Sequence, residues 1–251
     1  MTGRSRILTY RWLCGAACLI FVSSTHAVDR ENLRFHLSFE DGVMPAISAG
    51  TAGPGNTTMT FQTGSDRDIR RVPGRRGMGL RMSPSVSLRY AALESFSRDE
   101  GTLALWIKPV GWSGLKHGRR FLTALSDRAV LNFYIYPGNL YYYIDSTQGR
   151  YYLINTAEDG NQRDPFRDGQ WTFLAGTFKP GEQRFYVNGH FMNAMTEGLI
   201  EPRFSSRGIV EIPPGDQVLD EVMIFDRALT DKEIKAIYEA NVPRRTDTAA
   251  P

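Results

Sequence analysis

The residues whose types best suit ligand binding are tyrosines that crowd the segment between positions 134 and 151. From Leu131 to Tyr136 apolar and polar residues alternate, so the polar ones lie together on the face opposite the apolar ones. A turn at 137–138 then returns the chain antiparallel, which brings a tyrosine of the run 141–143 and one of the next strand beside them. The predicted ligand-binding residues are Asn132, Tyr134, Tyr136, Tyr143 and Tyr151.

These residue types suit sugars. A tyrosine ring covers the C–H face of a pyranose, while its hydroxyl and a neighbouring amide exchange hydrogen bonds with the sugar hydroxyls. The set therefore predicts a platform for a poly- or oligosaccharide. The alternative interpretation is that these tyrosines, which are good strand formers, only cover a half-exposed sheet.

A second group with ligand chemistry is a set of six arginines between positions 67 and 81, with no lysine among them. Guanidinium groups bind sulfate and carboxylate in a forked geometry, so the set allows an anionic, sulfated or uronic polysaccharide as the partner. The alternative is a solvated loop whose charge is balanced by nearby acids such as Asp66 and Asp68.

The first 27 residues have the pattern of a secretory signal peptide: arginines, then an apolar stretch from Trp12 to Val22, then a short polar exit ending at Ala27. As a helix the apolar stretch spans only about 16 Å, against about 30 Å of bilayer hydrocarbon. We expect cleavage after Ala27, no membrane span in the mature chain, and a secreted or periplasmic location. Both cysteines lie in this leader, so the mature domain cannot be a disulfide scaffold.

Charge excludes one class of partner. The chain has 251 residues and a net charge of +3, and the leader contributes three arginines and no acid. The remainder therefore has equal numbers of basic and acidic residues, which argues against nucleic acid or an anionic membrane as the partner.

From Leu33 onward the hydrophobic period is two, and turn signals such as Asn188-Gly189 recur between the apolar runs. This pattern predicts an all-β domain over residues 28–241, with a surface loop at 42–64. One helix is expected after Thr230, because Thr230 and Glu233 form a capping box and Ile234 begins an apolar stripe. Residues 242–251 are expected to form a disordered tail.

Four segments together resemble laminin-G-like domains of the concanavalin A-like lectin/glucanase superfamily. They are LRFHLSFEDG at 33–42, GTLALWIKP at 101–109, WTFLAGTFKPGEQRFYVNG at 171–189 and LDEVMIFDRALT at 219–230. The resemblance covers about Leu33 to Ala240. It implies a jelly-roll sandwich of two antiparallel sheets, one of them concave, with a short C-terminal helix, and it does not imply a single function.

Several members of this superfamily carry a structural calcium between the first and last strands. By resemblance, the matching ligands are Glu40 or Asp41 together with Asp220, helped by main-chain carbonyls, and oxygen ligands suit this ion. The alternative is that these positions are a surface carboxylate and an acid at the end of a strand. No closely spaced acidic loop accompanies them.

The sequence does not favour catalysis. Retaining glucanases on this scaffold place their acids in a Glu-x-Asp-x-x-Glu strand, so that the two carboxyl groups lie about 5 to 5.5 Å apart, and the chain lacks this spacing. A lyase would need a tyrosine or histidine base beside a group that neutralises a uronate. Candidates for these roles are Tyr141, Tyr143, His117 and Arg150, but nothing in the sequence brings them together.

We therefore expect a secreted domain that binds carbohydrate or another extracellular ligand without catalysis. The first alternative is a polysaccharide lyase or glycoside hydrolase on the same fold. The second is a protein-interaction or adhesion module.

Overall fold

The computed structural model describes residues 30–54, 57–92, 94–97, 99–126, 129–146, 149–155, 164–196 and 208–240. The predicted signal peptide and the predicted tail lie outside these residues, so both stay predictions. Within the described part of the chain, no helix is long and apolar enough to cross a membrane.

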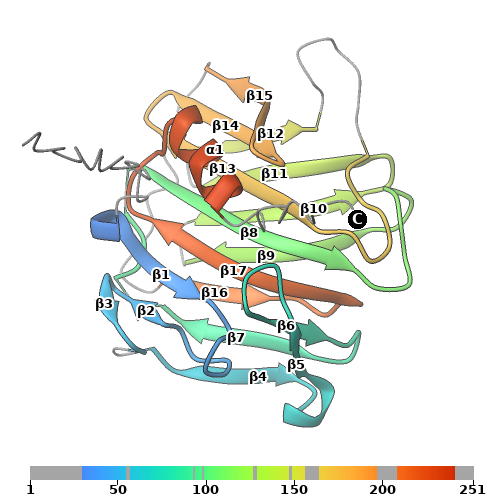
Figure 1. Ribbon diagram of the computed structural model, residues 1–251. Helices are drawn as coiled ribbons and strands as arrows, with labels where there is room; N and C mark the ends of the chain where they lie inside the picture. The colour runs from blue at the N-terminus through green and yellow to red at the C-terminus, as the bar shows by residue number, and fades with distance from the viewer. Residues whose placement is uncertain are drawn as a thin grey trace, which may run out of the picture.

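The described residues form two antiparallel sheets (Figure 1). The larger sheet has ten strands, namely β1 (Leu33–Leu37), β2 (Ile47–Ser48), β3 (Thr51–Ala52), β5 (Arg70–Pro73), β6 (Met78–Met82), β8 (Gly101–Pro109), β13 (Thr172–Lys179), β14 (Glu182–Val187), β15 (His190–Met195) and β17 (Gln217–Phe225). The smaller sheet has seven, namely β4 (Met59–Thr63), β7 (Ser87–Ala91), β9 (Arg119–Leu125), β10 (Ala129–Tyr136), β11 (Asn139–Ser146), β12 (Gly149–Ile154) and β16 (Ile209–Ile212). Short 3-10 turns lie at Arg30–Asn32 (η1) and Asp66–Asp68 (η2), and the helix α1 spans Asp231–Ala240. The predicted jelly-roll sandwich of two antiparallel sheets with a short C-terminal helix is confirmed.

The strand β17 organises the ten-stranded sheet. It pairs antiparallel with β8, β1 and β6, and all nine of its residues are buried. The seven-stranded sheet runs in the order β12-β11-β10-β9-β16-β7-β4, so β12 and β4 are its two edges.

The main core lies between the sheets and follows the period of two. Leu103, Leu105 and Ile107 of β8 enter it from one sheet, while Leu131 and Phe133 of β10 enter it from the other. The backbone of β13 approaches closely at Gly176, where a Cβ atom would lie 2.5 Å from the ring of Tyr142. Gly176 therefore leaves room for the ring of Tyr142 in the core. The residues on either side of Tyr142 along β11 point to the outer face of the sheet.

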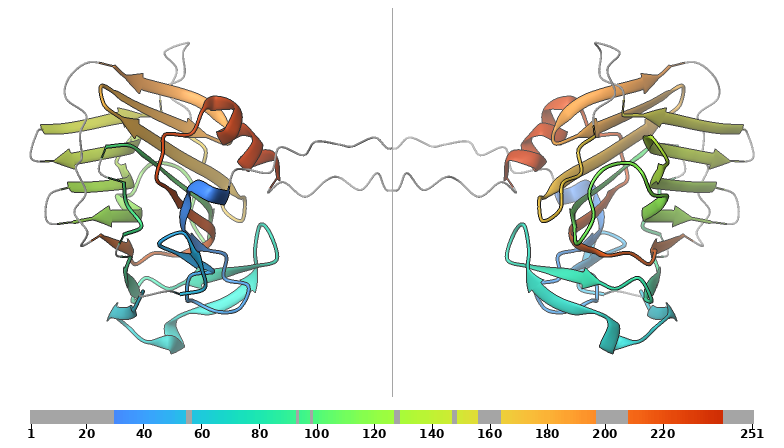
Figure 2. Two further views of the ribbon diagram at one scale, coloured as in Figure 1. Left: turned by 90° about the vertical axis from the view of Figure 1, so that its left-hand side faces the viewer. Right: turned by 90° about the vertical axis from the view of Figure 1, so that its right-hand side faces the viewer.

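A second, smaller core lies on the outer side of the ten-stranded sheet, under α1. Trp106, Phe173 and Tyr186 point outward from their strands and pack against Ile234 and Ile237 of the helix. Figure 2 shows α1 on the side of the sandwich away from β10–β12. The helix closes that face.

The predicted cap of α1 is confirmed. The Glu233 amide donates to Thr230 Oγ1 at 3.4 Å, and the Thr230 amide donates to Glu233 Oε2 at 2.8 Å. The Asn188-Gly189 turn is also confirmed, because both residues have positive φ, as a two-residue type I′ hairpin requires.

The surface loop expected at 42–64 is wrong as stated. The short strands β2 and β3 and the edge strand β4 form there. These strands are short or mostly exposed, so they lack the apolar alternation by which a strand is recognised in a sequence.

Candidate functional site

The outer face of the seven-stranded sheet carries a continuous row of polar and aromatic side chains. Strand register places one outward residue of each strand beside the next across the whole sheet. In order from β4 to β12 the row is Thr60, Arg89, Glu211, Thr123, Asn132, Tyr143 and Tyr152. In Figure 2 the strands β10–β12 form the outer layer of the molecule on this side.

Four tyrosines gather at the β12 end of this row, and we call them the tyrosine cluster: Tyr134, Tyr141, Tyr143 and Tyr152. The rings of Tyr134 and Tyr141 stack with centroids 4.9 Å apart and planes inclined by 11°. Tyr143 meets Tyr134 edge to face at 6.0 Å, and Tyr152 meets Tyr141 edge to face at 6.1 Å. The cluster thus links side chains from three neighbouring, backbone-paired strands, β10, β11 and β12.

This packing decides which ring surfaces a ligand can reach. The stacked faces of Tyr134 and Tyr141 are occupied by each other, and these rings offer mainly their edges and hydroxyls. Tyr152 is 57% exposed at one side of the stack, and Tyr136 is 65% exposed near the β10–β11 turn. These two residues present the most accessible ring surface.

The sequence correctly placed Tyr134, Tyr136, Tyr143 and Asn132 on one face, but the placement of Tyr151 there was wrong. Tyr151 pairs with the core residue Ile144 and packs against the main core, whereas Tyr152 pairs with Tyr143 and points outward. The reason is register, because adjacent residues of a strand point to opposite faces and a shift by one exchanges them. The sequence left open which tyrosine of the run 141–143 lies beside Tyr134. Strand register shows that Tyr141 lies directly opposite Tyr134 and so belongs to the same face.

Asn132 lies inside the row between Thr123 and Tyr143 and is only 8% exposed. Among the described residues its Oδ1 atom has no hydrogen-bond partner. A buried carbonyl oxygen without a donor is costly, and because this atom is closed to solvent, a ligand would reach it only if neighbouring side chains moved.

A charged pair borders the cluster. The Tyr143 hydroxyl donates to Asp145 Oδ2 at 2.8 Å, and Arg150 Nε lies 3.2 Å from the same oxygen. Burial, followed by the hydrogen bond to Asp145, raises the pKa of Tyr143 to about 12. Burial also raises the pKa of Tyr134. Both hydroxyls are therefore protonated near neutral pH, which suits hydrogen bonding and disfavours a tyrosine base.

The predicted calcium ligands lie elsewhere, beside the turn that joins β5 to β6. Asp220 Oδ2 accepts hydrogen bonds from the amides of Arg75 and Arg76 at 2.7 and 2.9 Å, and Glu40 Oε1 accepts from the amide of Met78 at 3.2 Å. Burial raises the pKa of Asp220 to about 7, although these amide contacts and that of Glu221 favour the charged form. Among the described residues no three or more histidine, cysteine, aspartate or glutamate side chains are grouped so that they could hold a metal. The predicted site also relies on main-chain carbonyls, and it stays a prediction.

A family profile described as the concanavalin A-like lectin/glucanases superfamily, of laminin G type, matches residues 83–235. The chain belongs to this superfamily. The matched span includes β8 to β17 and every tyrosine of the cluster. No curated protein matches the chain.

Solved structures share the superfamily fold at low sequence identity. Domain 4 of AbnA, a GH43 extracellular arabinanase from Geobacillus stearothermophilus solved with arabinotriose, has a TM-score of 0.61 and 20% identity, covering 83% of this chain and 100% of that one. The binding domain of Paraclostridial Mosquitocidal Protein 1 has a TM-score of 0.63 and 17% identity, covering 84% of this chain and 52% of that one. A structure of botulinum neurotoxin type C, whose cell entry depends on two ganglioside molecules, has a TM-score of 0.66 and 11% identity, covering 86% and 53%. The chain thus spans about half the length of the two toxin chains.

Proposed function

We propose that this superfamily member is an exported, non-catalytic carbohydrate-binding domain whose ligand contacts the tyrosine cluster. The observation that carries the proposal is the cluster itself: four rings on the outer face of β10–β12, beside an amide and a charged pair. Aromatic rings surrounded by hydrogen-bonding groups match the alternation of C–H faces and hydroxyls on a sugar.

The structural neighbours support the same class of ligand. The arabinanase domain, which matches this chain over its whole length, was solved with arabinotriose. The cell entry of the neurotoxin depends on two ganglioside molecules, and this chain spans about half of that neurotoxin chain. In this chain we expect the exposed ring of Tyr152 to cover a sugar face, while the tyrosine hydroxyls of the cluster exchange hydrogen bonds with sugar hydroxyls.

The test is a glycan array followed by calorimetry on the glycans that bind. The ring of Tyr152 is expected to contribute on the order of 1 kcal/mol, so Tyr152→Ala should weaken binding about fivefold. Tyr134→Ala/Tyr143→Ala removes two further rings and their hydroxyls from the cluster, and it should weaken binding about tenfold or more while leaving the fold intact. Tyr152→Phe is the matched control, because it keeps the ring and removes only the hydroxyl, and it should retain most of the affinity.

Two outcomes contradict the proposal. Unchanged affinity of the double variant would remove the tyrosine cluster from the binding site. Release of a shortened or unsaturated product from any glycan on the array would favour the lyase or glycoside hydrolase instead.

Export is a separate part of the proposal and has its own measurement. The intact mass of the secreted protein should correspond to a chain that begins at Val28. A mature protein that retains residues 1–27 would contradict both the cleavage site and the extracytoplasmic location.

A further inference from the structure

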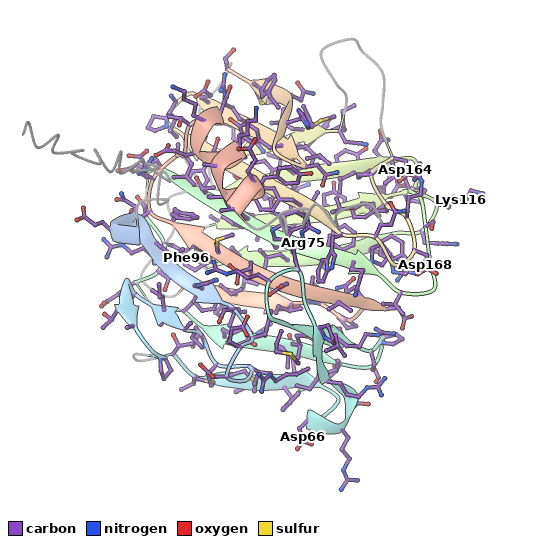
Figure 3. All side chains as sticks on the ribbon, in the orientation of Figure 1. Asp66, Arg75, Phe96, Lys116, Asp164 and Asp168 are labelled. Carbon is purple, nitrogen blue, oxygen red and sulfur yellow. The ribbon has the colours of Figure 1, made fainter. Side chains whose placement is uncertain are left out.

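A hollow of about 340 Å³ lies at the other end of the molecule, where η2 meets the β5–β6 hairpin. It is lined by Arg67, Asp68, Arg70, Arg81, Met82 and Ser83. Figure 3 marks the neighbouring Asp66 at the lower end of the sandwich, and β4, which leads into η2, is the sheet edge opposite β12. The hollow is therefore separate from the tyrosine cluster.

The three arginines that line the hollow differ in how their guanidinium groups are held. Arg81 is held in place, because it donates to the Met82 and Gln217 carbonyls and pairs with Asp216 at 3.3 Å. Among the described residues, the side chains of Arg67 and Arg70 have neither an ion pair nor a hydrogen bond. The guanidinium group of Arg81 is therefore fixed, and it lies beside those of Arg67 and Arg70, which are available to bind a ligand.

The acid in the hollow does not neutralise these arginines by contact. Asp68 Oδ2 accepts from the amide and hydroxyl of Ser65, at 2.8 and 3.1 Å, and its Oδ1 accepts from the Ser85 hydroxyl at 3.2 Å. Both oxygens are used to hold the turn η2, and these hydrogen bonds lower the pKa of Asp68.

Strand pairing places two of these arginines opposite each other, and Asp216 balances the charge of only one of them. Arg70 and Arg81 are direct cross-strand partners, and like charges in this position destabilise a sheet. The same row continues through Val218 to Lys108 on β8. Neighbouring strands are about 4.8 Å apart, so Lys108, which lies over the ring of Trp171, is about 15 Å from Arg70 along this row, with the apolar Val218 between it and Arg81.

We propose that this hollow is an oxyanion site and that it binds the sulfate or carboxylate groups of an acidic polysaccharide. Arginine forks match both anions in geometry, and a row of cations suits a polymer with repeated charges better than a single ion. The six residues that line the hollow include no aromatic ring, whereas single-stranded nucleic acid sites rely on base stacking. The site does not depend on the sugar-binding role of the tyrosine cluster.

The experiment measures binding at low salt of a sulfated polysaccharide that carries no carboxylate groups and of its chemically desulfated, uncharged counterpart. The variant is Arg67→Gln/Arg70→Gln, and the control is Lys232→Gln/Lys235→Gln on α1, which changes the net charge equally at exposed positions. Charge-assisted hydrogen bonds predict a loss on the order of tenfold for each arginine, and no loss in the control. The wild-type affinity should fall steeply as salt screens the charges.

Two further measurements sharpen the assignment. Lys108→Gln should weaken binding of the polymer and leave binding of inorganic sulfate unchanged, because that lysine lies two strands from Arg81. Sulfate should raise the melting temperature of the wild type more than that of Arg67→Gln/Arg70→Gln, because binding to the folded state stabilises it. Comparing the two proteins cancels the general stabilising effect of sulfate.

Three results would overturn the proposal. One is equal polymer affinity in the wild type and Arg67→Gln/Arg70→Gln, with circular dichroism showing that both are folded. Another is equal binding of the desulfated polymer and its sulfated parent. The third is an oligonucleotide of matched charge that binds as tightly and with the same arginine dependence, which would remove the polysaccharide. Binding of neutral glycans by Tyr134→Ala/Tyr143→Ala tests only the proposed function. Either result of that measurement leaves the anion site unaffected.

Discussion

The two sheets of this domain both carry aromatic residues on their outer faces, and the residues differ in what covers them. On the ten-stranded sheet the ring of Trp106 stacks on that of Tyr238 of α1, with the ring centroids 5.4 Å apart. The guanidinium of Arg75 lies 4.6 Å from the centre of the Trp106 ring. Figure 3 shows Arg75 at the tip of the β5–β6 hairpin, in front of the sheet. On the seven-stranded sheet the ring contacts of the tyrosine cluster within the described part of the chain are with one another, and Tyr152 is more than half exposed.

The difference teaches that alternation along a strand does not by itself tell whether an outward aromatic ring stabilises the fold or binds a ligand. The role depends on which other elements pack against the ring. Both faces arise from the same alternation along buried strands. Where a helix and a hairpin pack on the face, the rings become a second core and contribute stability. Where none of the described elements packs on it, the rings remain available to a ligand.

The strongest test of this comparison removes one ring from each face. Trp106→Ala should lower the free energy of unfolding by about 3–5 kcal/mol, because it leaves a large cavity under α1. Tyr152→Ala should lower it by less than about 1 kcal/mol, since its ring is largely solvated. Denaturant unfolding measures both, and similar losses in the two variants would show that the faces do not differ as described.

A second test concerns Asp220, whose contacts hold the turn that covers Trp106. The pKa of this carboxyl is raised from 3.8 to about 7, so the unfolded chain loses the proton near pH 4 while the folded protein keeps it until about pH 7. The stability contributed by this proton is therefore complete below pH 4 and is lost as the pH rises to about 7. Its size is on the order of 2–4 kcal/mol.

The measurement is the stability difference between the wild type and Asp220→Asn across this pH range. Asparagine keeps an acceptor for the turn amides and cannot titrate, so the difference should change with pH between about 4 and 7 and be flat outside these limits. A difference that is constant with pH would remove Asp220 as the titrating group.

The smallest expected effect is that of calcium. If the ion binds beside Glu40 and Asp220, millimolar calcium should raise the melting temperature by a few degrees, and Asp220→Ala should abolish the increase. Magnesium at the same concentration is the control for ionic strength. Identical melting curves with calcium and with a chelator would assign both carboxylates to the turn alone.

Much of the fold could be predicted because its signals are local. The alternation of Leu131 to Tyr136, the Asn188-Gly189 turn and the Thr230–Glu233 cap each lie within a few residues, and each forms as expected. The position of Tyr151 could not be read in this way, because its side depends on the register that β12 takes against β11. Contacts between distant segments were also inaccessible, as the role of Asp220 at the turn amide of Arg75 shows.

The pairing of β1 with β17 has a consequence for how the chain folds. Leu33 lies opposite Phe225, and His36 lies opposite Met223, so the centre of the larger sheet joins segments almost two hundred residues apart. Contacts of such long range slow folding, since a large loop must close before they form. During synthesis β1, β6 and β8 are made before β17, their common partner. Until β17 is made, the edge of each strand that pairs with it has unpaired backbone groups that can mispair. A chain that stops before residue 217 therefore lacks the strand that joins β1, β6 and β8 into the larger sheet, even if every other strand is present.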